Sequence, residues 1–93
     1  MKAELISKDR FNVTENSFVE IVIWRVPEPL LGSNHRYKYR LAFIENDICV
    51  LRYDNEAGKG DHKHYGKREF DYHFIGLDEL RRDFMADVRR LMK

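Results

Sequence analysis

Two histidines and a lysine in the glycine-rich stretch 53–66 are the residues of this chain best suited to chemistry. The stretch reads YDNEAGKGDHKHYG, with Lys59 between two glycines and with His62 and His64 separated by one residue. Histidine exchanges protons near neutral pH, because the free side chain titrates at about pH 6.5. A lysine flanked by glycines lets the backbone approach a phosphate closely. We therefore predict a functional connection here; a solvated loop of the same composition is the alternative.

These residue types fit the cleavage of an RNA phosphodiester by its neighbouring 2′-hydroxyl. That reaction needs a base, an acid and cations that stabilise the charged phosphorane. The sequence predicts His62 and His64 as the acid–base pair and Lys59 as the electrostatic stabiliser. Asp54 and Asp61 are the candidates for orienting a histidine or an arginine. The side chains expected to bind the nucleic-acid backbone are Lys38, Arg40, Arg52, Lys63 and His35.

A metal site is a second interpretation of the same histidines. In an extended strand, His62 and His64 would project to one side, and Asp54 or Asp61 would complete a set of two nitrogens and one oxygen. Two histidines at this spacing often occur by chance, and the lysines beside them disfavour a divalent cation. We therefore expect no metal and no other cofactor.

The composition indicates one globular domain spanning residues 1–93. The chain has 35% charged and 43% hydrophobic residues, which is typical of a folded protein and not of a disordered one. Its single cysteine excludes an internal disulfide framework, and it has no apolar run long enough for a membrane helix or a signal peptide. The expected location is the cytoplasm. The net charge is only +1, but residues 35–40 and 59–68 together carry +6, which favours a local phosphate-attracting patch.

Hydrophobic patterns predict an α+β fold. We expect a curved antiparallel sheet of four to five strands with one C-terminal α-helix packed on a face. The predicted strands are residues 3–8, 18–26, 36–45, 48–53 and 69–75, and the helix begins at about Leu77. The strand at 18–26 is apolar on both faces, which predicts a central position with cover on both sides and permits a homodimer.

The strands at 36–45 and 48–53 are predicted to form a hairpin across Asn46 and Asp47, two residues that tolerate positive φ. A regular hairpin would pair Phe43 with Val50, Leu41 with Arg52 and Tyr39 with Asp54 on one face. Its far end would deliver Lys38, Arg40 and Arg52 beside the stretch 53–66.

Four sequence blocks resemble the TumE family of toxins from bacterial and archaeal toxin–antitoxin pairs. The blocks are FVEIVIWRVPEPLLGSNHRYKYRLAF, YDNEAGKGDHKH, the Tyr72-His73-Phe74 strand and the final LDELRRDFMADV, and the resemblance covers nearly the whole chain. It implies a small cytoplasmic protein that is neutralised by a helix-turn-helix antitoxin. It brings no catalytic residue with it, so the site residues above rest on their own chemistry.

Two functional hypotheses follow. The first is an RNA-directed toxin that acts as a metal-independent ribonuclease through the Gly/Lys/His segment. The second is a non-catalytic module that binds nucleic acid or protein and is partnered with a helix-turn-helix regulator. The two differ in whether the histidines are needed: a binding module requires charge but no titrating pair.

Overall fold

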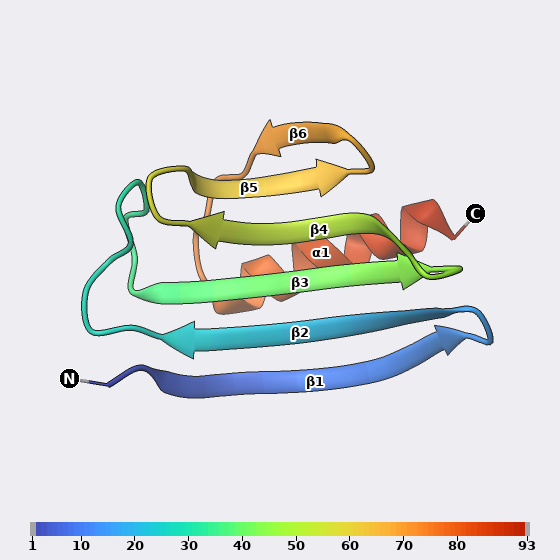
Figure 1. Cartoon of the computed structure of the whole chain (residues 1–93), viewed down its shortest axis with the longest axis horizontal. Helices are drawn as coiled ribbons and strands as arrows, with labels where there is room; N and C mark the ends of the chain where they lie inside the picture. The colour runs from blue at the N-terminus through green and yellow to red at the C-terminus, as the bar shows by residue number, and fades with distance from the viewer. Residues whose placement is uncertain (1, 93) are drawn as a thin grey trace.

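Over residues 2–92, the computed structural model shows one antiparallel sheet of six strands with a helix on one face (Figure 1). The strands follow one another in the sheet in chain order, so every neighbour is reached by a hairpin or a loop and the sheet stays open. The elements are β1 (Glu4–Thr14), β2 (Ser17–Arg25), β3 (Tyr37–Glu45), β4 (Ile48–Glu56), β5 (Gly60–Tyr65), β6 (Arg68–Asp71) and α1 (Leu77–Leu91).

The α+β class is confirmed, but the expectation of four to five strands is wrong because part of the stretch 53–66 is itself strand. β4 continues to Glu56 and β5 begins at Gly60, which leaves only a tight turn between them. Both faces of this hairpin carry polar side chains, so the alternation that marks a half-buried strand is missing from its sequence. The first strand is also longer than predicted. The last, β6, ends at Asp71, and the chain then runs without regular structure to the helix.

The β3–β4 hairpin turns at Asn46 and Asp47, as predicted, with φ angles of 52° and 66°. Its predicted register holds only next to the turn. Beyond Cys49 the pairing shifts by one residue, so Val50 has no partner on β3 and Leu51 stands opposite Phe43. This is a β-bulge, in which two residues of one strand face one residue of the other.

The bulge overturns the three predicted pairs of Phe43 with Val50, Leu41 with Arg52 and Tyr39 with Asp54. Leu41 instead pairs with Tyr53, and Arg40 pairs with Asp54. Because side chains alternate along a strand, the shift turns Tyr53 toward the helix and Arg52 and Asp54 toward the opposite face. The one extra residue of the bulge therefore determines that Arg52 and Asp54 lie on the face away from the helix.

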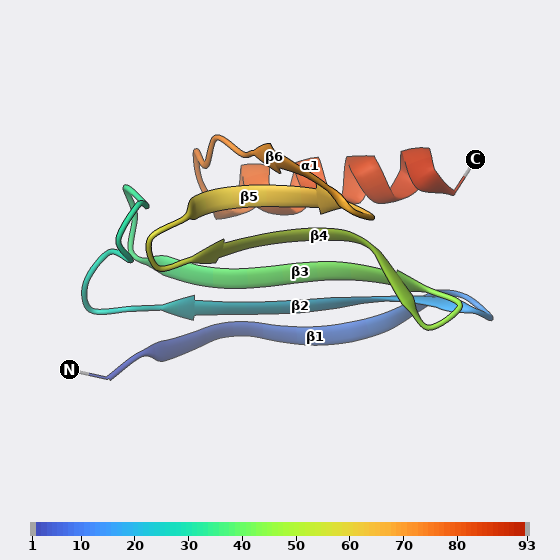
Figure 2. The same ribbon diagram turned by 45° about the horizontal axis from the view of Figure 1, so that its top comes forward.

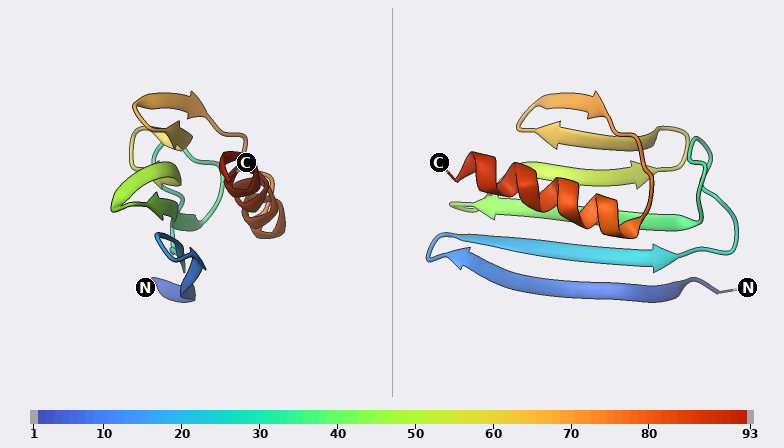
Figure 3. Two further views of the ribbon diagram at one scale, coloured as in Figure 1. Left: turned by 90° about the vertical axis from the view of Figure 1, so that its right-hand side faces the viewer. Right: turned by 180° about the vertical axis from the view of Figure 1, so that it is seen from behind.

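The hydrophobic core lies between the sheet and α1, which covers one face (Figures 2 and 3). The helix begins at Leu77, as predicted, and buries Leu80, Phe84 and Val88 along one stripe. The core residues contributed by the sheet are Val19, Ile21, Ile23, Tyr39, Leu41, Phe43, Leu51 and Tyr53. No helix in residues 2–92 has the length and apolar character needed to cross a bilayer.

The other face of the sheet carries no helix, and we call it the open face (Figure 1). The prediction that residues 18–26 are covered on both sides is therefore wrong. Val19, Ile21 and Ile23 of β2 are buried under the helix, whereas Val22 is only half-buried and Trp24 is 36% exposed on the open face.

Candidate functional site

A small pocket on the open face contains both predicted catalytic histidines. We call it the histidine pocket; its volume is about 30 Å³, and its lining residues are Arg52, Asp54, Glu56, Lys59, His62, His64 and Glu69. Alternation along β5 places His62 and His64 on the same face, and the β4–β5 register sets them opposite Asp54 and Arg52. Both imidazoles are largely shielded, with side chains 15% and 21% exposed. The hairpin thus assembles the predicted acid–base pair with an arginine, a lysine and an orienting carboxylate.

His62 has one ring nitrogen committed and one available. Its Nδ1 lies 3.1 Å from the carbonyl oxygen of Gly60. A carbonyl oxygen can only accept, so Nδ1 carries the hydrogen and donates it. In the neutral ring the lone pair is then on Nε2, which lies 3.6 Å from Asp71 Oδ1 and 3.8 Å from Glu69 Oε1. His62 is therefore arranged to accept a proton at Nε2.

His64 faces the same space from the next position on that side of β5. Its Nε2 lies 3.6 Å from Asp54 Oδ1 and 3.8 Å from Glu69 Oε1. The centroids of the two imidazole rings are 6.5 Å apart. The Nε2 atoms of His62 and His64 therefore flank one point next to the Glu69 carboxylate. Such a spacing suits an acid and a base that act on opposite sides of one reacting group.

The two carboxylate oxygens of Asp54 face different residues, Arg52 and His64. Oδ2 lies 2.9 Å from Arg52 Nε, while Oδ1 is the oxygen nearest His64. The Arg52 Nε atom is buried and its N–H is not aligned for a hydrogen bond, so the contact is electrostatic. The geometry is the one expected of an orienting residue: a half-buried carboxylate beside both a histidine and an arginine.

Lys59 is held at the rim of the histidine pocket by the β4–β5 turn. Its side chain is 64% exposed, and Nζ lies 3.8 Å from Glu56 Oε2. Lys38 and Arg40 project on the same open face from β3 but do not line the pocket; Arg40 is the register neighbour of Asp54. The structure therefore gathers Lys59 and Arg52 at the histidines, and places Lys38 and Arg40 one strand farther away.

The remaining predicted residues lie on the helix side of the sheet. Alternation along β5 points Asp61 and Lys63 away from the histidine pocket. Lys63 Nζ lies 3.5 Å from Asp87 Oδ2 on α1. The predicted contacts of Lys63 and His35 with nucleic acid remain predictions. Neither side chain lines the histidine pocket, although His35 lines a separate pocket together with Lys59.

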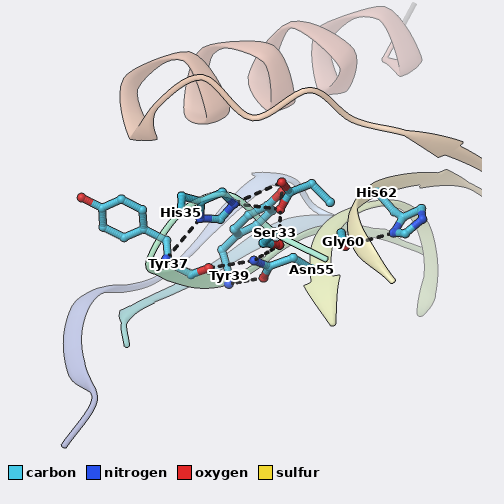
Figure 4. A network of polar contacts seen from close by, with 8 residues as sticks. Ser33, His35, Tyr37, Tyr39, Asn55, Gly60 and His62 are labelled. Carbon is cyan, nitrogen blue, oxygen red and sulfur yellow. Dashed lines mark hydrogen bonds and ion pairs between the residues drawn. The ribbon is translucent and has the colours of Figure 1, made fainter. Parts of the chain in front are cut away.

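Asp61 orients His35 and not the histidines of β5 (Figure 4). His35 Nε2 lies 2.9 Å from Asp61 Oδ1, and its Nδ1 accepts the Tyr37 N–H at 3.2 Å, so both ring nitrogens are occupied. The Tyr39 hydroxyl also donates to Asp61, at 3.1 Å. Burial, and then the negative charge of Asp61, raises the pKa of Tyr39. The His35 ring stacks on Phe74 at 3.7 Å. These contacts make the network a structural anchor.

This anchor fastens the loop between β2 and β3 to the turn that carries Lys59. The buried Asn55 side chain accepts the Tyr39 N–H at 3.0 Å and donates to the Tyr37 carbonyl at 2.7 Å. Gly32 and Gly60 touch backbone to backbone: a Cβ on Gly60 would lie 2.8 Å from the Gly32 oxygen. Only glycine fits such an approach, and Gly60 also has φ +77°.

A second buried carboxylate ties α1 to the sheet. Asp87, 2% exposed, accepts a hydrogen bond from the Tyr53 hydroxyl at one oxygen and from Arg90 Nη1 at the other. Burial alone would raise the pKa of Asp87, but the hydroxyls of Tyr53 and Tyr65 and the cations Lys63 and Arg90 outweigh it and lower that pKa. Burial, and then the interaction with Asp87, raises the pKa of Tyr65 to about 12. Lys63 therefore has a structural partner here.

Comparison with known proteins identifies the family. The sequence model of the family described as Toxin TumE matches residues 2–92, which include all six strands and α1. The chain belongs to the TumE toxin family. No curated protein and no solved structure matches it. The family assignment confirms the resemblance noted in the sequence and supports a role as a toxin.

Two carboxylates beside the histidines of this TumE family member were not foreseen from its sequence. Glu69 and Asp71 reach His62 and His64 from β6, where the register pairs Glu69 with His64 and Asp71 with His62. These two pairs follow from a two-residue hairpin turn at Gly66 and Lys67, a turn that can be read from the sequence. Among residues 2–92, no group of three or more histidine, cysteine, aspartate or glutamate side chains has the arrangement to hold a metal ion.

Proposed function

We propose that this member of the TumE toxin family is an RNA-directed toxin that cleaves RNA at the histidine pocket without a metal ion. The observation that carries the proposal is the pair of shielded imidazoles on one face of β5, whose Nε2 atoms both lie 3.8 Å from the same Glu69 oxygen. Family membership supports the toxin role. The cations Arg52 and Lys59 in the same pocket supply positive charge for a phosphate.

In the proposed reaction, His62 Nε2 takes the proton from a ribose 2′-hydroxyl as the 2′-oxygen attacks the adjacent phosphorus. The bond between phosphorus and the leaving 5′-oxygen breaks, and that oxygen takes a proton from His64. The products are a 2′,3′-cyclic phosphate and a 5′-hydroxyl, so protons and charge balance. Lys59 and Arg52 offset the extra negative charge of the transition state. Asp54 holds His64 and Arg52 in place.

Glu69 and Asp71 repel a phosphate unless they move. Their side chains are 48% and 100% exposed, which leaves both free to rotate away from the imidazoles when RNA enters. A phosphate is larger than the 30 Å³ pocket, so the proposed reaction requires this rotation.

The test is cleavage of single-stranded RNA by purified protein, in EDTA and again with added Mg²⁺. We expect His62→Ala and His64→Ala each to lower the cleavage rate by about 10²-fold or more while the folded protein still binds RNA. His73→Ala is the matched control, because His73 is an exposed histidine outside the histidine pocket. RNA left intact by the unmodified protein under both conditions would refute the ribonuclease proposal, as would normal cleavage by the His62→Ala, His64→Ala double variant.

The second candidate is a non-catalytic binding module, and it is favoured by the position of Lys38 and Arg40 on the open face outside the pocket. If it is correct, the histidine variants keep their toxicity in cells, whereas Lys38→Glu or Arg40→Glu abolishes it. For either function we propose that a helix-turn-helix antitoxin neutralises the toxin; membership of a toxin family supports an antitoxin partner. Co-expression of the toxin with a candidate helix-turn-helix protein tests this partnership: a true antitoxin restores growth and co-purifies with the toxin, and failure of both excludes that candidate.

A further inference from the structure

The open face continues well beyond the histidine pocket, and the strand register aligns its side chains in rows. One row crosses all six strands: Lys8, Val22, Arg40, Asp54, His62 and Asp71. The adjacent row holds Arg10, Glu20, Ala42, Arg52, His64 and Glu69. The two catalytic candidates therefore lie in line with the side chains of β1, β2 and β3, and no helix of the described chain separates them.

The β1–β3 half of this face is basic, and we call it the basic half. Its charged side chains are Lys8, Arg10, Lys38 and Arg40 against Glu20 alone. The position of Arg10 on this face is independently supported, because its guanidinium carbon lies 4.1 Å from the centroid of the Phe18 ring. The β4–β6 half is acidic by comparison, with Asp54, Glu56, Glu69 and Asp71 around Arg52 and the histidines. A polyanion would therefore be drawn first to the basic half.

Trp24 lies at one end of this surface, where its register neighbours are Leu5 on β1 and Lys38 on β3. Trp24 is 36% exposed. Together with Val22, Lys38, Tyr39 and Arg40 it lines a hollow of about 220 Å³. The indole is open to solvent beside Lys38 and shares the hollow with Lys38 and Arg40, while α1 covers only the other face of the sheet. Aromatic side chains on an open sheet are suited to stacking on unpaired bases, while the cations beside them bind phosphates.

We propose that the basic half is a binding track for single-stranded RNA, in which Trp24 stacks on an unpaired base and Lys38 and Arg40 hold the backbone that leads to the histidine pocket. Three strand spacings separate β2 from β5, or roughly 14 Å across the sheet, a length that a few nucleotides can span. A duplex does not fit this role, because its bases are stacked on one another and cannot cover the indole. This inference rests on the RNA-directed function proposed above and adds the substrate class and its path.

The chain has a single tryptophan, so its fluorescence reports on this position alone. The probe is a short single-stranded oligoribonucleotide with 2′-O-methyl groups, which cannot be cleaved through the 2′-oxygen. We expect saturable quenching of Trp24 with the single strand and much weaker quenching with the same sequence as a duplex. Binding measured by anisotropy of a labelled oligonucleotide should weaken about tenfold in Trp24→Ala and less than about threefold in Trp24→Phe, which keeps a stacking ring.

Phe70→Ala is the matched control, because Phe70 is 38% exposed and, as the partner of Lys63, lies on the other face of the sheet. We expect this variant to bind like the unmodified protein. Circular dichroism verifies that each variant is folded; if Trp24→Ala is not folded, quenching in the unmodified protein and the Trp24→Phe comparison decide the matter. Absence of quenching, or equal affinity of Trp24→Ala and Phe70→Ala, would overturn the track.

The outcome separates the track from the ribonuclease proposal. If RNA is cleaved but Trp24→Ala has an unchanged KM and no quenching occurs, the track is wrong and the histidine pocket stands. If RNA is bound and quenches Trp24 but is never cut, the track stands and the catalytic proposal fails. A concentration-dependent dimer that is lost in Trp24→Ala, without any RNA binding, would overturn the track by assigning the face to a second copy of the chain.

Discussion

At the scale of single residues, the histidine pocket contains the proposed reacting residues, His62 and His64, and the proposed orienting residue, Asp54. Asp54 is half-buried and contacts both His64 and Arg52. Asp71 also lies beside a histidine but is fully exposed at its side chain. Asp54 and Asp71 each lie 3.6 Å from an imidazole, but because only Asp54 is shielded we expect their substitution to have different effects.

We expect Asp54→Asn to lower the rate of RNA cleavage by at least about tenfold without weakening RNA binding. The amide keeps the shape of the side chain but removes the charge that holds His64 and Arg52, and less negative charge near the phosphate does not harm affinity. Single-turnover cleavage and anisotropy measure the two effects separately. Asp71→Asn should leave the rate within about threefold. Equal losses in the two variants would show that Asp54 has no special role.

The buried carboxylate of Asp87 predicts how stability depends on pH. Its pKa in the folded protein is lowered, so it stabilises the fold at pH values above its unfolded pKa of about 3.9, and this stabilisation is lost as the pH falls through the folded-state pKa. We expect Asp87→Asn to reduce the free energy of unfolding at pH 7 by about 2–4 kcal/mol, because Lys63 and the Tyr53 hydroxyl lose their anion. Urea unfolding should show this difference constant above about pH 5 and smaller below pH 4. A difference independent of pH would contradict the assigned charge.

At the scale of elements, the β4–β5 turn carries Lys59 and depends on the loop between β2 and β3. Its support is the backbone contact of Gly32 with Gly60 and the hydrogen bond from the Gly58 N–H to the Leu31 carbonyl, at 2.6 Å. Two glycines of one turn therefore differ in their surroundings. Gly58 has φ +87° and open space around it, whereas Gly60 has φ +77° and a crowded site.

This difference gives a paired test of the loop contact. Gly58→Ala should cost about 1 kcal/mol of stability, the strain of an alanine at positive φ. Gly60→Ala should cost clearly more, about 2–4 kcal/mol, because its Cβ would collide with the Gly32 backbone as well. Thermal or urea unfolding of the two variants measures the gap. Equal losses would mean that the loop yields freely and does not hold the turn.

At the scale of the whole molecule, the net charge is only +1, but the charges on the open face are unevenly distributed, with cations in the basic half. RNA binding should therefore weaken with salt even though the protein is nearly neutral. We expect Lys38→Glu and Arg40→Glu each to lower RNA affinity roughly tenfold at low salt. Each lost phosphate contact should also reduce the slope of log K against log[salt] by about 0.7. Arg82→Glu is the control, because Arg82 is exposed on α1 over the opposite face. Unchanged slopes in the β3 variants would exclude them as backbone contacts.

Local patterns predicted the parts of this fold that local physics determines. The helix has a strong stripe from Leu80 to Val88, and the hairpin turn has two residues that accept positive φ, so both were predictable. The bulge at Val50 has no such signal, because Cys49, Val50 and Leu51 are all suited to a strand. Its position depends on which side chains fit under α1, and that is tertiary packing.

The candidate site was predictable to the same extent. Alternation placed His62 and His64 on one side, and the structure brings Arg52, Asp54 and Lys59 to them. Asp61 and Lys63 lie on the other face of β5, because side chains alternate along the strand that aligns the two histidines. The β4–β5 register, which decides the partner of each of these side chains, cannot be read from a stretch whose composition is that of a loop.

The bulge at Val50 also determines which changes in chain length the protein can accept. Leu51 pairs with Phe43 immediately after the bulge. This pairing determines which face of the sheet each later side chain of β4 lies on. Adding or removing one residue directly after Leu51 would carry Tyr53 to the open face and Asp54 under the helix. A substitution in this stretch does not change the face on which the other side chains lie. Over evolutionary time, this part of the chain should therefore drift in residue type far more readily than in length.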